Sequence, residues 1–445
     1  MKLGLGLFGT LRMAGLLAVA MAACPALAAD SASPDVAMSL ERSACYGSCP
    51  VYRVTIHGDG RVQFTTRTSP VHKVDAIHRQ FSRSRGVLVS GTLEDRVSPE
   101  AAQALLAQFE AAGFWQLKDE YRAYVTDLPT QVITLAVGDR QKSVTDYDGR
   151  SAGMPLAAHD LEAAIDRVAG TERWVTGGPG LVPWLERNGF DFRSTGAAEL
   201  AVNGEDDSAD EATVLSLIDH GAPLDRPLTF RSRFAERTGA AGTMLMEASI
   251  RRGHAGVFAR LAAAGWLDRL GKTKAAELLS RSAAGCSPAL VDAAADAGVD
   301  IDYAVFDPRE DDDDQGKTAL AELAGTYTCR EQEPARIQTA DRLLARGANP
   351  NHRDKLGRTP LYGVENPQLL EVLLAHGADA TVKSKNGRSM VFGSWTDAIV
   401  LRLLEAGASP VGRYDYDGKT LKQKAKASMP LVAQWLAAHP ESFRR

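Results

Sequence analysis

Leu343-Leu344-Ala-Arg-Gly347-Ala-Asn-Pro-Asn351 is followed by two variants of itself, Leu373-Leu374-Ala-His-Gly377-Ala-Asp-Ala-Thr381 and Leu403-Leu404-Glu-Ala-Gly407-Ala-Ser-Pro-Val411. The three glycines lie at intervals of thirty residues. A leucine pair is typical of the buried side of a helix, and a glycine after it supplies the left-handed conformation in which many helices end. The pattern therefore predicts helices that end at regular intervals.

A second motif follows each of these endings, in Gly357-Arg-Thr-Pro-Leu361, Gly387-Arg-Ser-Met-Val391 and Gly418-Lys-Thr-Leu421. In the first copy, the Thr359 hydroxyl can cap a helix and Pro360 presets its opening φ angle. Leu361 then points toward the core. Each unit is thus expected to begin with a short helix and to end with the leucine-rich one.

Together the two motifs resemble ankyrin repeats, which are helix–turn–helix units of about 33 residues with a Thr-Pro-Leu-His start and a Gly-Ala-Asp/Asn end. The spacing of thirty is about one helical turn short, which we attribute to a truncated first helix. Earlier units keep the glycine endings Gly189, Gly221, Gly265 and Gly298. The resemblance implies an all-α ankyrin-repeat solenoid of about seven or eight units over residues 178–445.

Residues 30–175 lack this repeat and predict a separate α+β domain. Two pairs of alternating segments, 51–57 with 61–65 and 131–137 with 142–144, are joined by glycine turns and predict hairpins. Ser98-Pro99 predicts a helix start, and Leu156, Leu161, Ile165 and Val168 predict the apolar side of a closing helix. Gly177-Gly178-Pro179-Gly180 is the linker, and the flanking Trp174 and Trp184 are expected to make the join rigid.

The first 28 residues predict a secretory signal peptide. An apolar run from Met13 to Ala23 precedes the small residues Ala26-Leu27-Ala28, so we expect cleavage after Ala28 and a periplasmic or secreted protein. The run is too short to span a membrane, and no transmembrane segment is expected later. Met21-Ala22-Ala23-Cys24 supports an alternative, a lipoprotein signal with a lipid anchor at Cys24.

The composition and the absence of certain motifs exclude several classes of partner and function. A hydrophobic content of 44% excludes wholesale disorder, and a net charge of −5 without a dense basic cluster argues against nucleic acid. The acidic run at residues 308–314 follows no calcium-loop spacing, and we interpret it as a solvated insertion between repeats. We found no nucleophile, metal or phosphate motif, so the sequence predicts no enzyme, no cofactor and no catalytic or metal-ligating residue.

One dense motif, Arg42-Ser-Ala-Cys45-Tyr-Gly-Ser-Cys49-Pro50-Val-Tyr52, opens the first domain. It resembles the start of an uncharacterised bacterial family, a domain of unknown function, and brings no activity with it. Three interpretations of the cysteine pair compete: a structural disulfide, a copper site and a redox centre. The strand-like residues after it disfavour the last two. Cys286 and Cys329, in neighbouring repeats, are expected either to form a second disulfide or to stay as buried thiols.

Two hypotheses for function follow. In the first, the solenoid is a scaffold that binds another protein of the cell envelope through its hairpin tips and does no catalysis. The expected contact residues are Asn351, His352, Arg353, Lys383, Lys385, Arg413, Tyr414 and Tyr416. Their alternative is a role as solvated turn residues. In the second hypothesis, the first domain is a copper-binding or enzymatic module and the repeats are its docking arm.

Overall fold

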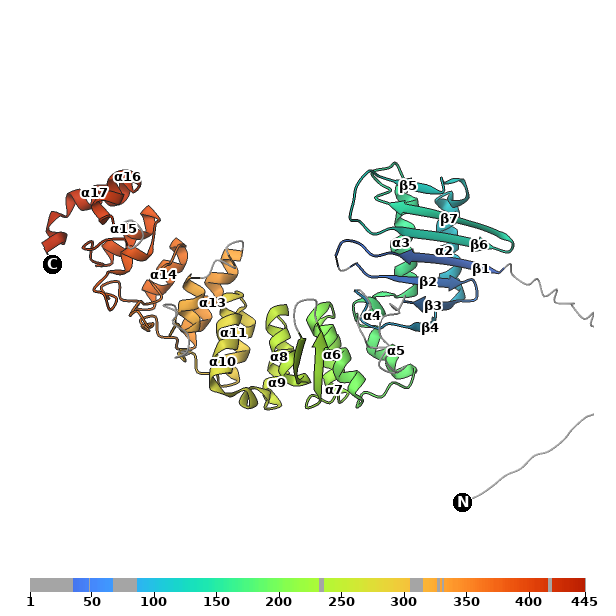
Figure 1. Cartoon of the computed structure of the whole chain (residues 1–445), viewed down its shortest axis with the longest axis horizontal. Coiled ribbons are helices and arrows are strands. Elements are labelled where there is room, and N and C mark those ends of the chain that lie inside the picture. Colours follow the sequence, from blue (N-terminus) through green and yellow to red (C-terminus); the bar gives the residue numbers. More distant parts are fainter. Residues whose placement is uncertain are drawn as a thin grey trace, which may run out of the picture.

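The computed structural model describes residues 35–47, 49–66, 86–231, 236–304, 315–325, 329, 332–414 and 418–444. A sheet domain lies at one end, and the helices continue from it in a curved row (Figure 1). The predicted signal peptide, Cys24, the acidic run and Tyr416 lie outside the described residues. Within those residues, no helix combines the length and the apolar character needed to cross a membrane.

Seven strands form one sheet in the order β4-β3-β2-β1-β6-β7-β5. They are β1 (Val36–Arg42), β2 (Tyr52–His57), β3 (Arg61–Thr65), β4 (Thr92–Arg96), β5 (Glu120–Arg122), β6 (Gln131–Val137) and β7 (Arg140–Tyr147). The two predicted hairpins are confirmed as β2–β3 and β6–β7, and β1 joins them by pairing antiparallel with both β2 and β6. Only β5 runs parallel to its neighbour, β7.

Two helices, α2 (Pro99–Ala111) and α3 (Leu156–Ala169), pack side by side on one face of the sheet (Figure 1). Ser98 caps α2 by accepting a hydrogen bond from the Ala101 N–H at 3.2 Å, as predicted. Leu161 and Ile165 of α3 are buried. Leu156 is wrong as a core residue, because it is the first residue of the helix and its side chain faces solvent. The domain is α+β, as expected.

The join is packed. After α4 (Glu172–Val175), the glycine linker leads to α5 (Leu181–Arg187), and the buried rings of Trp174 and Trp184 meet edge to face at 5.7 Å. The Trp184 indole N–H donates to the Glu94 carbonyl of β4 at 3.1 Å. The first helix after the linker is therefore bound to the sheet edge, and the expected packing of Trp174 and Trp184 at the join is confirmed.

Helices make up most of the rest of the described chain. The helices are α6 (Thr195–Asp207), α7 (Glu211–Asp219), α8 (Ala241–Arg252), α9 (Ala255–Ala263), α10 (Trp266–Ala284), α11 (Pro288–Asp296), α12 (Ala319–Gly325), α13 (Glu333–Ala345), α14 (Pro367–Ala375), α15 (Asp397–Glu405), α16 (Leu421–Ser428) and α17 (Pro430–Ala438). Several of them pack in sequential pairs: α6 with α7, α8 with α9, α10 with α11, α12 with α13 and α16 with α17. The all-α prediction needs a correction here. A hairpin of β8 (Pro227–Arg231) and β9 (Glu236–Ala240) precedes α8, because cross-strand pairing satisfies the backbone groups of this insertion.

The predicted glycine endings are confirmed. Gly347, Gly377 and Gly407 follow α13, α14 and α15 with φ of 96°, 86° and 98°. The next N–H bends back in each case, for example from Ala378 to the Leu373 carbonyl at 3.0 Å, which satisfies a carbonyl at the helix end. The same positive φ occurs at Gly189, Gly221, Gly265 and Gly298.

The shortened first helix is also confirmed. Residues 360–363 form only a turn, and the equivalent residues of the next unit form a 3-10 turn, η3 (Met390–Gly393). The predicted cap at Thr359 is wrong for the same reason: no helix follows it, and its buried hydroxyl has no hydrogen-bond partner. Thr420 caps α16 instead, where the first helix is of ordinary length.

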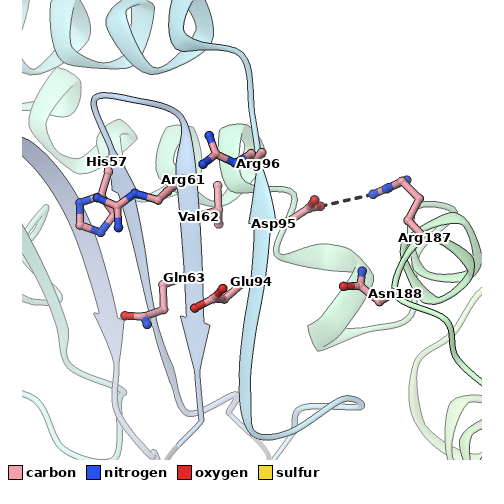
Figure 2. A pocket seen from close by; sticks show the side chains of 9 residues that line it. All are labelled: His57, Arg61, Val62, Gln63, Glu94, Asp95, Arg96, Arg187 and Asn188. Carbon is pink, nitrogen blue, oxygen red and sulfur yellow. Dashed lines mark hydrogen bonds and ion pairs between the residues drawn. The ribbon is translucent and has the colours of Figure 1, made fainter.

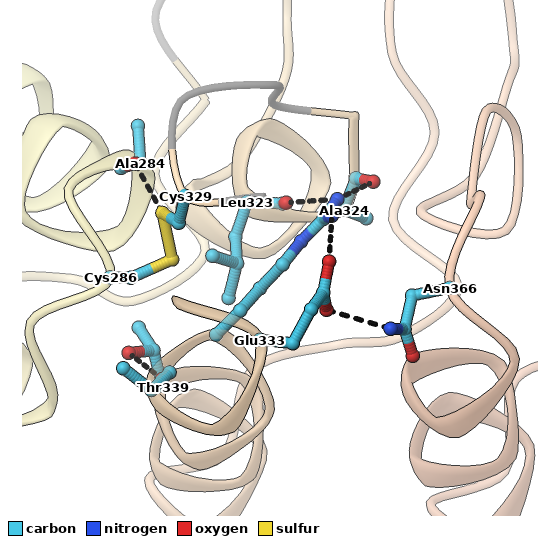
Figure 3. The surroundings of a disulfide bond; sticks show 10 residues. Ala284, Cys286, Leu323, Ala324, Cys329, Glu333, Thr339 and Asn366 are labelled. Atoms are coloured by element: carbon cyan, nitrogen blue, oxygen red, sulfur yellow. Dashed lines mark hydrogen bonds and ion pairs between the residues drawn. A yellow bond between two sulfur atoms is a disulfide. The ribbon is translucent and has the colours of Figure 1, made fainter. Parts of the chain in front are cut away.

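Both cysteine pairs form disulfides, Cys45–Cys49 and Cys286–Cys329. The second bond joins two loops: Cys286 follows α10 and Cys329 follows α12 (Figure 3). The helices α10 and α12 are the first helices of adjacent units. The Sγ of Cys329 lies 3.0 Å from the Ala284 carbonyl oxygen. Because both sulfurs of Cys45 and Cys49 are bonded to each other, the pair offers no thiolate for copper or for redox attack in this structure.

Because the join is tightly packed, we expect a larger side chain at Gly177 to destabilise the protein. The φ of Gly177 is +78°, and an added Cβ would lie 2.5 Å from Leu88 Cδ2. We expect Gly177→Ala to lower the free energy of unfolding by about 2–4 kcal/mol through overpacking and backbone strain. Tryptophan fluorescence during urea unfolding measures this, because Trp174 and Trp184 are buried at the join.

Gly189→Ala is the matched control. Its φ of +68° is similar, but nothing lies within 4 Å of the added Cβ. Only the backbone strain of about 1 kcal/mol remains there. Equal losses in the two variants would contradict tight packing at the join.

Candidate functional site

The ends of the cysteine motif meet on the face of the sheet that α3 covers. Arg42 is the last residue of β1 and Tyr52 the first of β2, and the two are direct partners in the antiparallel ladder. The disulfide loop between them is a strand connection. The motif therefore places the guanidinium of Arg42 and the phenol of Tyr52 side by side, facing α3.

Both side chains bind Asp166 of α3. The Arg42 Nη2 lies 2.8 Å from Asp166 Oδ2, and the Tyr52 hydroxyl donates to Asp166 Oδ1 at 2.7 Å. The Thr171 hydroxyl donates to the same Oδ1 at 2.8 Å, and the Arg42 Nε–H donates to the Tyr52 oxygen at 3.0 Å. Arg42 Nη1 also reaches Glu162 Oε2 at 3.4 Å. Asp166 is thus held by three donors from three different segments.

A second group, Asp146, His159 and Glu162, continues this network. Asp146 of β7 is buried and accepts hydrogen bonds from the Gly149 N–H at 2.6 Å and from His159 Nδ1 at 2.9 Å. Glu162 is also buried, and its Oε1 has no hydrogen-bond partner. One ligand atom from each of Asp146, His159 and Glu162 lies within 4.8 Å of the others. These three residues are the ones here that could hold a metal ion.

Burial controls the protonation of this cluster, which we call the Arg42 cluster: Arg42, Tyr52, Asp146, His159, Glu162 and Asp166. Burial raises the pKa of Glu162 to about 8; Arg42 opposes the rise, and the carboxylates of Asp146 and Asp166 add to it. Burial also raises the pKa of Tyr52, and Asp166 adds to the rise. Tyr52 therefore serves as a hydrogen-bond donor, and Glu162 can carry a proton at neutral pH.

Sequence reasoning missed four of these residues. His159, Glu162 and Asp166 recur at i, i+3 and i+7 on α3, a spacing that places polar groups on one helix face. That polar stripe beside the apolar residues was the available signal. Nothing local pointed to Asp146, because its role depends on the pairing of β7 with β6, which places the end of β7 near α3.

The disulfide loop packs against the segment between β5 and β6. The Ser43 N–H donates to the Thr130 carbonyl at 2.9 Å, and the Tyr46 N–H to the Asp127 carbonyl at 3.2 Å. The two loops together expose the large side chains of Tyr46, Tyr124, Val125 and Leu128. The cysteine pair thus holds the shape of a surface loop and takes no part in the cluster below it.

The predicted contact residues divide into structural and exposed groups. Asn351 bridges two units: its Nδ2 donates to the Gly377 carbonyl at 2.8 Å, and its Oδ1 accepts from the Asp379 N–H at 2.7 Å. His352 Nε2 lies 3.1 Å from the Gly316 carbonyl oxygen. Tyr414 is wrong as a surface anchor, because it is 1% exposed and stacks on Trp395 at 4.9 Å.

The other four described contact residues are exposed cations, Arg353, Lys383, Lys385 and Arg413. We call them the tip cations. Arg353 donates to the Lys383 carbonyl at 2.6 Å and Arg413 to the Gly418 carbonyl at 2.8 Å. The structure brings them onto three consecutive hairpin tips.

A shallow pocket of about 390 Å³ lies where α5 meets the open face of the sheet (Figure 2). Its lining residues are His57, Arg61, Val62, Gln63, Glu94, Asp95, Arg96, Arg187 and Asn188. Asp95 pairs with Arg187 at 3.4 Å and with Arg173 at 3.0 Å. These pairs connect α4 and α5 to β4, so we assign the pocket to the join.

Removing the cation of the Arg42 cluster, Arg42 itself, is expected to destabilise the first domain strongly. We expect Arg42→Ala to lower the free energy of unfolding of the first domain by about 3 kcal/mol, because Glu162 and Asp166 would stay partly buried without a counter-charge. The matched control is Arg53→Ala, which removes an exposed arginine from its pair with Glu41 and should cost less than about 1 kcal/mol. Urea unfolding of both variants makes the comparison; similar losses would contradict the role of Arg42.

The raised pKa of Glu162 predicts a pH dependence of opposite sign to that of an ordinary paired carboxylate. Between pH 4.5 and about 8 the folded protein keeps a proton that the unfolded chain releases, so stability falls as pH rises through this window. Glu162→Gln stays neutral and should remove that fall. The free energy of unfolding of both proteins is measured across pH 4–9 with a chelator present, since a cation would compete with the proton. Parallel curves would contradict a protonated Glu162.

Comparisons with known proteins found one matching family model and similar solved structures. Residues 36–169 match the family model described as a domain of unknown function, DUF6438. The search of curated proteins gave no match. Solved structures similar to this chain include the ankyrin repeat domain of Bcl-3, a member of the IkappaB protein family, at 16% identity and TM-score 0.33, over 51% of this chain and 91% of that one. Another is the human ASB11 ankyrin repeat domain, at 17% identity and TM-score 0.34, over 52% and 93%. The ankyrin-like character of the repeats rests instead on the helix pairs and glycine endings described above.

Proposed function

We propose that this chain is an exported scaffold that binds another protein of the cell envelope through the hairpin tips of its last repeats, without catalysis of its own. The observation that carries the proposal is the row of tip cations, Arg353, Lys383, Lys385 and Arg413, exposed on consecutive tips. A stack of repeats presents an extended surface of this kind to a partner.

The tips are held in place before any partner arrives. The Lys355 N–H donates to the Gln315 carbonyl at 2.9 Å, and the Lys385 N–H to the Leu356 carbonyl at 2.8 Å, so adjacent tips are bonded to each other. Asn351 adds a side-chain bridge between two of them. A surface that is already ordered loses little conformational entropy on binding, which favours affinity.

The charge of the tips indicates an acidic partner surface. Asp354, the acid nearest in sequence to Arg353, is buried and paired with Arg358 at 2.6 Å, so it does not neutralise the exposed cations. Complementary charge speeds association and sets orientation more than it raises affinity. We therefore infer a partner with carboxylates in a row, bound with a rate that falls as salt is added.

Two features support export. The first 28 residues have the pattern of a signal peptide, and both disulfides suit an oxidising compartment. In this proposal the mature chain works in the periplasm or outside the cell, and a lipid anchor at Cys24 stays the alternative mode of attachment.

Photo-crosslinking tests the binding surface in the native compartment. A photoreactive residue at Lys385 is expected to capture one protein, whereas the same residue at Gln368 should not, because this exposed position lies at the end of α14 away from the tips. With the captured partner purified, Lys383→Gln with Lys385→Gln should lower the association rate about 10-fold at low salt and leave the fold intact.

Equal capture at both positions would contradict the tip surface. So would an unchanged association rate in the double variant. Asn351 is left intact in these experiments, because its removal would disturb the bridge between tips and confuse a lost contact with a lost shape.

A further inference from the structure

The scaffold function leaves Asp146, His159 and Glu162 unexplained. A buried carboxylate oxygen normally has a donor, and an unmet one costs folding free energy. Glu162 is 6% exposed, and in its ionised form its Oε1 has no donor, whereas a protonated Glu162 can donate to the neighbouring Asp146 carboxylate. The three side chains come together so closely that one atom of each lies within 4.8 Å of the other two. The unmet oxygen therefore belongs to a compact group of ligand atoms.

The charges of the cluster do not balance. Asp146, Glu162 and Asp166 supply three carboxylates, and Arg42 is the cation that contacts two of them, Glu162 and Asp166. In the form with Glu162 deprotonated, three negative charges against one positive leave a net charge of −2; without a bound ion, a proton on Glu162 offsets one of them. Buried charges are stable when they are paired or bound to a metal. A divalent cation would supply the missing charge.

We propose that Asp146, His159 and Glu162 bind one divalent transition-metal ion of the zinc class. An imidazole with two carboxylates is a ligand set that favours such ions over Ca²⁺ or Mg²⁺, which prefer oxygen alone. His159 and Glu162 stand one turn apart on α3, and Asp146 faces them from β7, so the ligands come from rigid elements. Three protein ligands leave a further position for water or another small ligand.

Neighbouring residues hold the ligands in place. The Gly149 N–H donates to Asp146 Oδ1, and a Cβ at Gly149 would lie 2.8 Å from that oxygen, so only glycine allows the approach. Arg42 holds Glu162 Oε2 and is itself held by Asp166 and Tyr52. Such outer contacts orient ligands in metal sites. His159 Nδ1 donates to Asp146 Oδ2 in the ion-free protein. On binding, Nδ1 gives up its proton to solvent, Nε2 takes up a proton in its place, and any proton on Glu162 is released to solvent.

Calorimetric titration of the full chain, with both disulfides intact, with ZnCl₂ tests the proposal. We expect one stoichiometric site, and a loss of affinity on the order of 100-fold in His159→Gln, because deleting a ligand should cost at least as much as deleting an outer contact. His159 is partly exposed, so this variant is expected to fold. MgCl₂ and CaCl₂ should give no comparable site.

The repeats contain a matched control. His254 Nδ1 lies 2.9 Å from Glu205 Oε2, and Glu205 is buried with an unmet Oε1, as Glu162 is. Among the residues that the structure describes, this pair has no third ligand. Glu205→Gln should therefore bind zinc as the parent does, whereas Glu162→Gln should not.

A second readout uses the unmodified chain with CoCl₂. Co²⁺ bound by one nitrogen and two carboxylates should give visible d–d absorption bands that ZnCl₂ abolishes by competition. Absence of stoichiometric zinc binding, full affinity in His159→Gln, or a loss in Glu205→Gln equal to that in Glu162→Gln would each overturn the proposal. These results are independent of the tip surface, since neither His159 nor Glu162 lies in the repeats.

Discussion

The repeats depend on the burial of apolar helix faces that no single helix pair can cover. Leucines such as Leu343, Leu373 and Leu403 recur at the same place in successive units and are fully buried. Each pair buries them only by packing on the next, so the row has to be covered at both ends. At the first end α5 binds the sheet through Trp184. At the other end, α16 carries the exposed Lys422 and Lys426, which suit a polar outer face.

This constraint explains how the sheet domain and the repeats form one molecule. Gly177 lets the chain turn between Leu88 and Ala209, which belong to the sheet domain and to the loop before α7. Arg173 and Arg187, on either side of the linker, share Asp95. The sheet domain thus covers the first helices, while its own polar centre around Arg42 remains separate from the join.

Much of the architecture follows from local patterns. The glycine endings, both β-hairpins of the first domain, the helix start at Ser98 and the shortened repeats were all predictable, because each depends on a few neighbouring residues. The β8–β9 hairpin was not predicted, and neither was the extent of the shortening after Thr359, where a turn replaces the whole first helix. In both places the chain departs from the repeat pattern, and packing against adjacent units sets the conformation.

The candidate sites show the same division. Arg42, Tyr52 and the cysteines drew attention as a motif, and the four tip cations were recognisable as hairpin residues. Tyr414 stands beside Arg413 in the sequence, yet it is buried under Trp395, because the tip folds back on the preceding unit. Asp146 and Glu162 are sixteen positions apart, and nothing between them indicates that they meet.

The sequence by itself therefore determined the two-part organisation, the repeat endings and the disulfide candidates, since short-range backbone preferences and residue spacing decide them. Only the tertiary structure decided which side chains converge. Asp146 reaches His159 because β7 pairs with β6, one of the strands on which α3 packs, and this places Asp146 close to the helix. Arg42 reaches Asp166 because α3 also packs on β1 and β2. These contacts depend on packing between segments that are far apart in the sequence, so no single stretch of sequence predicts them.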